Sequence, residues 1–99
     1  MNDKDLEILS LLQEECAEVI QIISKIRRFG FESRNPYIAD ATDNRALLEH
    51  ELGDVCLLID VLIERGLVTK SFIEHRIENK RIKLIEMNVL EERNNSNEN

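Results

Sequence analysis

The stretch LEILSLLQEECAEVIQIISKIRRF, residues 6–29, decides the fold. Its apolar residues recur at the spacing of one face of an α-helix. Arg27 and Arg28 precede Gly30, an order typical of a helix end, because cations favour the last turn and glycine adopts the left-handed conformation that follows it. We therefore predict a first long helix over residues 6–29.

A second stretch, RALLEHELGDVCLLIDVLIER, residues 45–65, has the same apolar periodicity. Asp43 or Asn44 can cap its start, and Gly66 lies just past its end. These signals predict a second long helix.

Residues 30–44 hold turn-forming residues without a sustained period, which predicts a loop with room for a short helical turn near residues 37–41. A loop of this length hints at a function, such as that of a lid. A third long helix is expected over about residues 70–92, with Thr69 or Ser71 as its N-cap.

Composition also favours helices. The chain has 99 residues, 42% hydrophobic and 33% charged, with one proline and three glycines, which disfavours a many-stranded sandwich or barrel. We predict one all-α domain over residues 1–92 and a polar, disordered tail over residues 93–99. Because three helices cannot cover apolar stripes this wide, we expect a helical bundle completed by oligomerisation, as a homodimer or homotetramer.

The formal net charge of −7 opposes tight binding to nucleic acid, since phosphate backbones require clustered Lys and Arg. Residues 1–5 lack the character of a signal peptide, and the most apolar run, residues 55–63, is interrupted by Asp60 and too short to span a bilayer. We expect a cytoplasmic protein with no nucleic-acid or membrane partner, in which Cys16 and Cys56 are reduced, buried thiols.

Both of the first two helices carry acids on the apolar face. With about 100° per residue, Glu15 lies in the middle of the first stripe and Glu18 at its edge. Glu51 and Asp54 take the same two positions on the second helix. Burying unpaired carboxylates is expensive, so protons, cationic side chains or a metal must neutralise them.

Four oxygen donors without a His or Cys pattern favour Mg²⁺, with Mn²⁺ as the alternative ion. A simpler interpretation is that the acids pair with Lys and Arg or lie near solvent at helix edges. A di-iron bundle is the competing metal interpretation, but its Glu-x-x-His pattern is missing, because Leu47 precedes His50, and Phe72 precedes His75, by three residues.

The segments EECAE, residues 14–18, and ELGD, residues 51–54, resemble the E-E-x-x-E and E-x-x-D motifs of MazG-like nucleotide pyrophosphohydrolases. The run over residues 14–30 is similar to the first helix of MazG-like proteins often encoded by bacteriophages, and the resemblance extends through about Leu90. It implies an all-α enzyme that uses Mg²⁺ to cleave a nucleoside triphosphate between the α and β phosphates, giving a monophosphate and pyrophosphate.

By this resemblance the metal ligands are Glu15, Glu18, Glu51 and Asp54. Glu14 is a further motif glutamate, which orients water or one of the ligands without binding the metal itself. Our hypothesis for the mechanism is in-line attack by a water that Glu15 or Glu18 activates as catalytic base, with Mg²⁺ offsetting phosphate charge.

Lys25 on the first helix and Lys80 and Arg81 on the third are the candidate phosphate-binding residues. The alternative for each is an ordinary solvated surface charge. Three aromatic residues near the loop could stack on a base, or pack in a core or a subunit contact instead: Phe29, Phe31 and Tyr37.

Two other functions compete with the hydrolase. A catalytically silent helical dimer could regulate or scaffold another protein, and it predicts no stabilisation by Mg²⁺. Phosphoribosyl-ATP pyrophosphohydrolase shares the superfamily and would keep the fold but change the substrate; only the shared metal motifs point to it.

Overall fold

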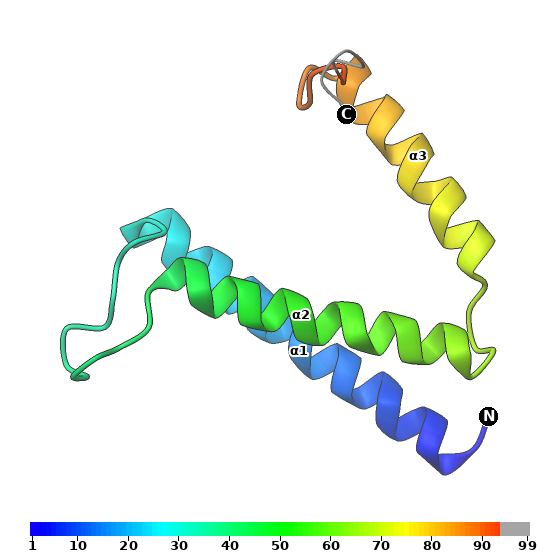
Figure 1. Ribbon diagram of the computed structural model, residues 1–99, viewed down its shortest axis with the longest axis horizontal. Coiled ribbons are helices and arrows are strands. Elements are labelled where there is room, and N and C mark those ends of the chain that lie inside the picture. Colours follow the sequence, from blue (N-terminus) through cyan, green and yellow to red (C-terminus); the bar gives the residue numbers. More distant parts are fainter. Residues whose placement is uncertain (94–99) are drawn as a thin grey trace. The chain divides into compact units, whose positions relative to one another are not determined.

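The computed structural model describes residues 1–93, which form three α-helices and no strand (Figure 1). The helices are α1 (Asp3–Phe29), α2 (Asn44–Glu64) and α3 (Lys70–Glu86), which confirms the predicted all-α fold. Within the described part of the chain, no helix is long and apolar enough to cross a bilayer. Of the predicted tail, residues 93–99, all but Arg93 lies outside the described residues.

The chain divides into two compact units. The first, Met1–Val68, contains α1 and α2, and the second begins at Thr69 and contains α3. The two are described separately below.

The ends of α1 and α2 follow the sequence signals. Asn2 Oδ1 accepts a hydrogen bond from Asp5 N at 2.9 Å, and Asp5 Oδ2 accepts one from Asn2 N at 3.0 Å, which forms a capping box at the start of α1. Gly30 ends α1 with φ 92°, and Gly66 follows α2 with φ 73°. The Asp43 carboxylate caps α2 by accepting a backbone N–H at 2.9 Å.

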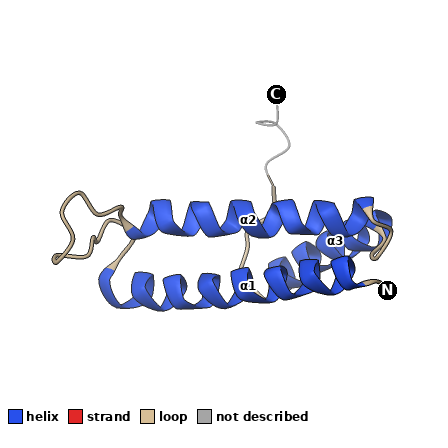
Figure 2. Cartoon of the chain, turned by 90° about the horizontal axis from the view of Figure 1, so that it is seen from below, coloured by secondary structure: helices blue, strands red, loops and turns tan. Residues whose placement is uncertain are grey.

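α1 and α2 lie side by side and run antiparallel (Figure 2). Their contact buries the apolar side chains of Ile8, Ile22 and Leu62. Other members of the predicted stripes are half-buried, and Leu11 is exposed. A single helix pair thus gives a thin core.

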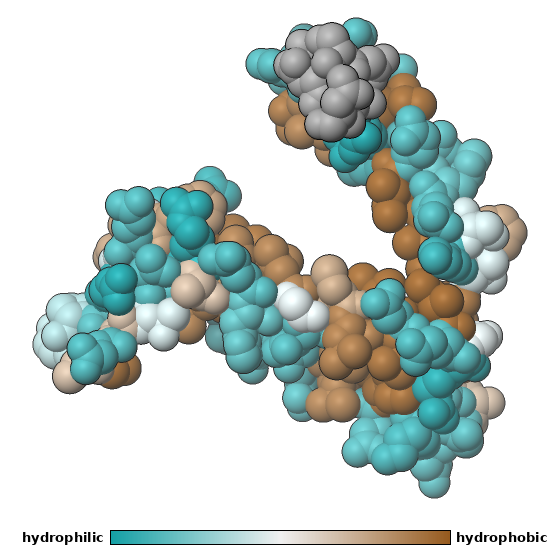
Figure 3. Space-filling model, viewed as in Figure 1, coloured by the Kyte–Doolittle hydropathy of each residue, from teal (hydrophilic) through white to brown (hydrophobic). Residues whose placement is uncertain are grey.

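Large apolar side chains remain on the surface of the first unit (Figure 3), including Ile20 at 66% and Leu57 at 61% exposure. Cys16 and Cys56 are free thiols and both are exposed. The prediction that these cysteines are buried is therefore wrong, because one antiparallel neighbour covers a narrower arc of each helix than a full bundle would.

The loop between α1 and α2 covers residues 30–43, one residue shorter than the predicted 30–44, because Asn44 already belongs to α2. The expected helical turn over residues 37–41 does not form: residues 36–40 make turns, in which Ile38 N donates to Asn35 O at 3.3 Å. The Asn35 side chain also accepts from Tyr37 N at 2.9 Å, so a local side-chain bond takes the place of a helical one.

In the second unit, α3 ends at Glu86, earlier than the predicted end near residue 92. The stop is Asn88, whose φ of 62° lies in the left-handed region, so that Val89 N turns back to donate to Leu84 O at 2.8 Å. Thr69 is the N-cap, as one of the two predicted candidates, although its side chain makes no capping hydrogen bond. No residue of α3 is buried.

Candidate metal centre

Three carboxylates meet in the middle of the α1–α2 contact. Glu15 and Glu18 lie one turn apart on α1, so both project from one face of that helix. Glu51 comes from α2, and one carboxylate oxygen from each of the three residues lies within 4.8 Å of the others. The structure therefore brings together three of the four predicted metal ligands, which we call the carboxylate cluster.

The carboxylate cluster has no cationic partner among the described residues. Glu15 Oε2 and Glu51 Oε2 are both buried and accept no hydrogen bond there. The ion pairs of residues 1–93 involve other acids: Glu7 with Lys4, Asp5 with Arg65, and Asp54 with His50. Pairing with Lys or Arg, the first part of the simpler interpretation, does not occur at this site within the described chain; the second part, a position near solvent, fits Glu18, which is exposed.

Crowding of the acids changes the protonation of Glu51. Its pKa is raised to about 8, first because the neighbouring Glu15 carboxylate shares a proton with it, then because of burial, and then through Glu18. The negative charges of Glu15 and Glu18 act in the same direction. Without a cation, the carboxylate cluster therefore retains a proton on Glu51 at neutral pH.

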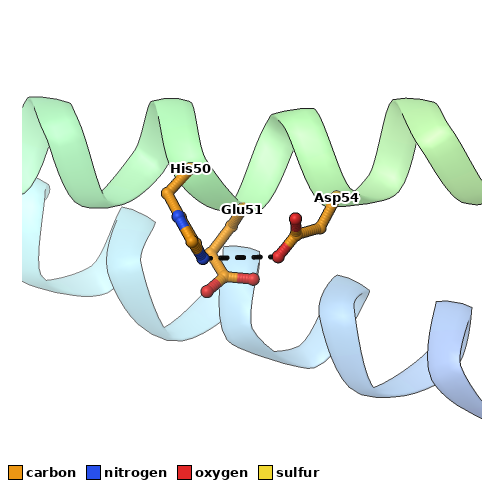
Figure 4. Close-up of side chains that lie close together, drawn as sticks. All are labelled: His50, Glu51 and Asp54. Carbon is orange, nitrogen blue, oxygen red and sulfur yellow. Dashed lines mark ion pairs between the residues drawn. The ribbon is translucent and has the colours of Figure 1, made fainter.

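Asp54, the fourth predicted ligand, lies in a second group with Glu51 and His50 rather than with Glu15 and Glu18. All three side chains leave α2 toward α1, and His50 Nε2 lies 3.5 Å from Asp54 Oδ2 (Figure 4). Glu51 belongs to both groups and so joins Asp54 to the carboxylate cluster. His50 was not among the predicted site residues; its spacing of four residues from Asp54 is the signal that could have found it.

The other predicted site residues lie elsewhere. Glu14 is exposed on α1 and belongs to neither group. Lys25 is exposed two turns beyond Glu18 and lines a cavity. Lys80 and Arg81 lie on α3 in the second unit, so their phosphate-binding role stays a prediction.

The donor set of the carboxylate cluster fits a hard divalent cation. Such ions prefer carboxylate oxygens, and one oxygen from each of the three acids lies within 4.8 Å of the others. The two buried oxygens without a donor are the atoms that a cation would satisfy. Glu15, Glu18 and Glu51 are thus the residues that could hold a metal, with Asp54 beside Glu51.

No family model, curated protein or solved structure matches this chain. The two motif segments, residues 14–18 and 51–54, are the segments that supply the clustered acids.

Proposed function

We propose that the protein is a cytoplasmic, Mg²⁺-dependent nucleoside triphosphate pyrophosphohydrolase that releases a nucleoside monophosphate and pyrophosphate. One observation supports this most: Glu15 and Glu51 face each other from two helices, each with a buried carboxylate oxygen that accepts no hydrogen bond within the described residues. A helix pair stabilised only by packing gains nothing from such acids. The reaction class is what the resemblance of the two motifs to those of MazG-like enzymes implies.

In this proposal Glu15, Glu18 and Glu51 hold Mg²⁺, or Mn²⁺ in its place, and Asp54 contributes from the Glu51 side. When bound, the ion supplies positive charge against the phosphate oxygens of the substrate. Glu14, exposed and outside the carboxylate cluster, orients water or a ligand from a distance.

Glu18 and Glu15 are the candidate bases. Glu18 is exposed while Glu15 is half-buried, so Glu18 is the acid of the carboxylate cluster that solvent water reaches more easily. It accepts a proton as the water oxygen bonds to phosphorus, and the bond between that phosphorus and the bridging oxygen breaks. Lys25 lies on the same helix and offers a cation to the phosphates, and Lys80 and Arg81 are further candidates on α3.

The assay that tests this proposal incubates the protein with Mg²⁺ and a panel of ribo-, deoxyribo- and modified triphosphates and separates the products by ion-exchange chromatography. We expect monophosphate and pyrophosphate, with turnover abolished in Glu18→Gln. Glu49→Gln is the matched control, because Glu49 is an exposed acid of α2 outside both acidic groups. Release of orthophosphate, no turnover, or full activity in Glu18→Gln would contradict the proposal.

We also propose that a second copy completes the bundle, as a homodimer or homotetramer. The α1–α2 pair buries few apolar side chains, and α3 buries none, while Ile20, Leu57 and Phe72 are 66%, 61% and 76% exposed. Exposed apolar surface of this kind is stabilised by association. Size-exclusion chromatography with light scattering checks this, and a folded monomer at micromolar concentration would rule it out.

A further inference from the structure

A cavity of about 490 Å³ opens where α1 ends, the loop turns back and α2 begins. This volume lies in the range of small-molecule sites, about 300–1,000 Å³. Its walls combine cationic, aromatic, amide and apolar side chains, among them Lys25, Phe29, Arg34, Tyr37, Asn44 and Leu47.

Hydrogen bonds hold the walls of this cavity in place. Asn44, 6% exposed, donates from its backbone N to Ser33 O at 3.0 Å and from Nδ2 to Gly30 O at 3.0 Å. Arg34 Nη1 spans the loop to donate to Ala41 O at 2.8 Å. Both ends of the loop are thus tied to the helix termini, so the cavity exists without a ligand.

The cavity continues the face that carries the carboxylate cluster. Lys25 follows Glu18 by seven residues, two full turns and about 10 Å along α1. Leu47 precedes Glu51 by four residues, about 6 Å along α2. Because the helices are antiparallel, both steps lead toward the loop, and Lys25 stands between the carboxylates and the aromatic walls.

The chemistry of the walls selects a ligand with a phosphate and a flat ring. In a chain of net charge −7, the cavity gathers the cations Lys25 and Arg34, which complement an anion. Tyr37 is 94% exposed, so its ring is open to stacking, whereas the Arg28 guanidinium lies over the Phe29 ring at 5.2 Å. A nucleoside 5′-phosphate carries both of these groups.

We propose that this cavity is the nucleoside subsite of the substrate, with the base stacked on Tyr37 and the phosphate nearest the sugar at Lys25. The inference rests on the proposed function, since it assigns the non-reacting part of the triphosphate to the cavity and the phosphate chain to the carboxylate cluster. Substrate recognition is then divided along the helix pair: the loop end binds the base, and the middle holds the reacting phosphates.

Tyr37 is itself the reporter, because the chain has one tyrosine and no tryptophan. The full-length protein in EDTA is titrated with a nucleoside monophosphate while tyrosine emission is followed, corrected for nucleotide absorbance; inorganic pyrophosphate and ribose 5-phosphate are the probes without a base. We expect saturable quenching by the nucleotide alone. Equal responses to all three probes, or none to the nucleotide, would overturn the subsite.

Variants locate the binding by calorimetry. Tyr37→Ala should weaken monophosphate binding by at least about fivefold, the lower range for loss of one stacked base, while Tyr37→Phe retains it. Ile38→Ala is the matched control, since Ile38 is a 59% exposed residue of the same loop outside the cavity wall. Lys25→Gln should weaken binding of the monophosphate but not of the free nucleoside, with Arg27→Gln as its control. Unchanged affinity in Tyr37→Ala would refute the assignment.

The two proposals fail separately. Monophosphate binding that depends on Tyr37, without hydrolysis of any triphosphate, would support the subsite and contradict the proposed pyrophosphohydrolase activity. Hydrolysis that is lost in Glu18→Gln, but whose KM is unaffected by Tyr37→Ala, would support the proposed function and contradict the subsite.

Discussion

Buried acids lie in two opposite environments within the α1–α2 pair. At its open end Asp5 is 8% exposed and fully partnered: Oδ2 accepts from Asn2 N at 3.0 Å and Oδ1 from Arg65 Nε at 2.7 Å. In the middle, Glu15 and Glu51 each bury an oxygen without a donor within the described residues. Asp5 therefore has hydrogen-bond donors for both of its carboxylate oxygens. The carboxylate cluster, where three acids meet, has none among residues 1–93 for its two buried oxygens.

Protonation follows this difference. The backbone hydrogen bond from Asn2, and then Arg65, lower the pKa of Asp5, whereas Glu15, burial and Glu18 raise that of Glu51 to about 8. An acid that only stabilises the fold is ionised and satisfied. Glu51, which retains its proton beside Glu15 and Glu18, can exchange it for a cation, and such sites commonly lower stability in return for function.

The largest expected effect is on catalysis. Glu15→Gln removes one charge from the carboxylate cluster and should lower the rate of triphosphate hydrolysis by about 10²- to 10⁴-fold, the range for loss of an acid–base group. Asp5→Asn removes one charge from the paired acid and should leave kcat near that of the wild-type protein. Initial rates with saturating Mg²⁺ measure both. Similar losses in the two variants would remove the distinction between the two regions.

The next effect is on thermal stability. Mg²⁺ at about 100 times its Kd should raise the Tm by roughly 11–22 °C, because an ion that binds only the folded state stabilises it by about 2.7 kcal/mol and each kcal/mol is worth about 4–8 °C in a domain of this size. The rise should persist in Asp5→Asn, whose own Tm is lower because Arg65 loses its partner. It should vanish in Glu15→Gln. Differential scanning fluorimetry with and without EDTA tests this, and a wild-type Tm indifferent to Mg²⁺ would favour a silent helical partner.

Much of the fold could be predicted from the sequence because its signals are local. Apolar periodicity, the cap at Asp43 and the glycines at positions 30 and 66 identify α1, α2 and the loop. The signal for the early end of α3 is also local, but it is an asparagine, Asn88. Asparagine adopts the left-handed conformation less often than glycine does, so it is a weaker stop signal. The exposure of Cys16 and Cys56 could not be predicted from local signals, because it depends on how many neighbouring helices cover α1 and α2.

The candidate site was predictable to the extent that helical spacing decides it. The i, i+3 spacing places Glu15 and Glu18 on one face, and the antiparallel pairing adds Glu51. The i, i+4 spacing of His50 and Asp54 allows their contact, but it could not show that Asp54 makes this contact in place of one with Glu15 and Glu18. Nor could it show the cavity, whose walls come from three separate segments.

The smallest effect is the pH dependence of stability without metal. Folded Glu51 holds its proton up to about pH 8, while the unfolded chain releases it near the ordinary value of 4.5. Between these values the folded state binds more protons, so its stability is greatest at the acidic end and falls as the pH rises through 8. Asp5 acts with the opposite sign: its contribution is present above 3.8 and is lost as the pH falls through its lowered pKa.

Urea unfolding in EDTA from about pH 5 to 9 separates the two regions because, of the two acids Glu51 and Asp5, Glu51 alone changes protonation over this range. Stability of the wild-type protein should decline over this range, and Glu51→Gln, which cannot ionise, should flatten the decline and be the more stable protein at the alkaline end. Asp5→Asn should be less stable throughout but keep the wild-type slope. Identical slopes for wild type and Glu51→Gln would mean that the carboxylate cluster holds no proton in the folded protein, and its acids would then be no different from the paired acid at the open end.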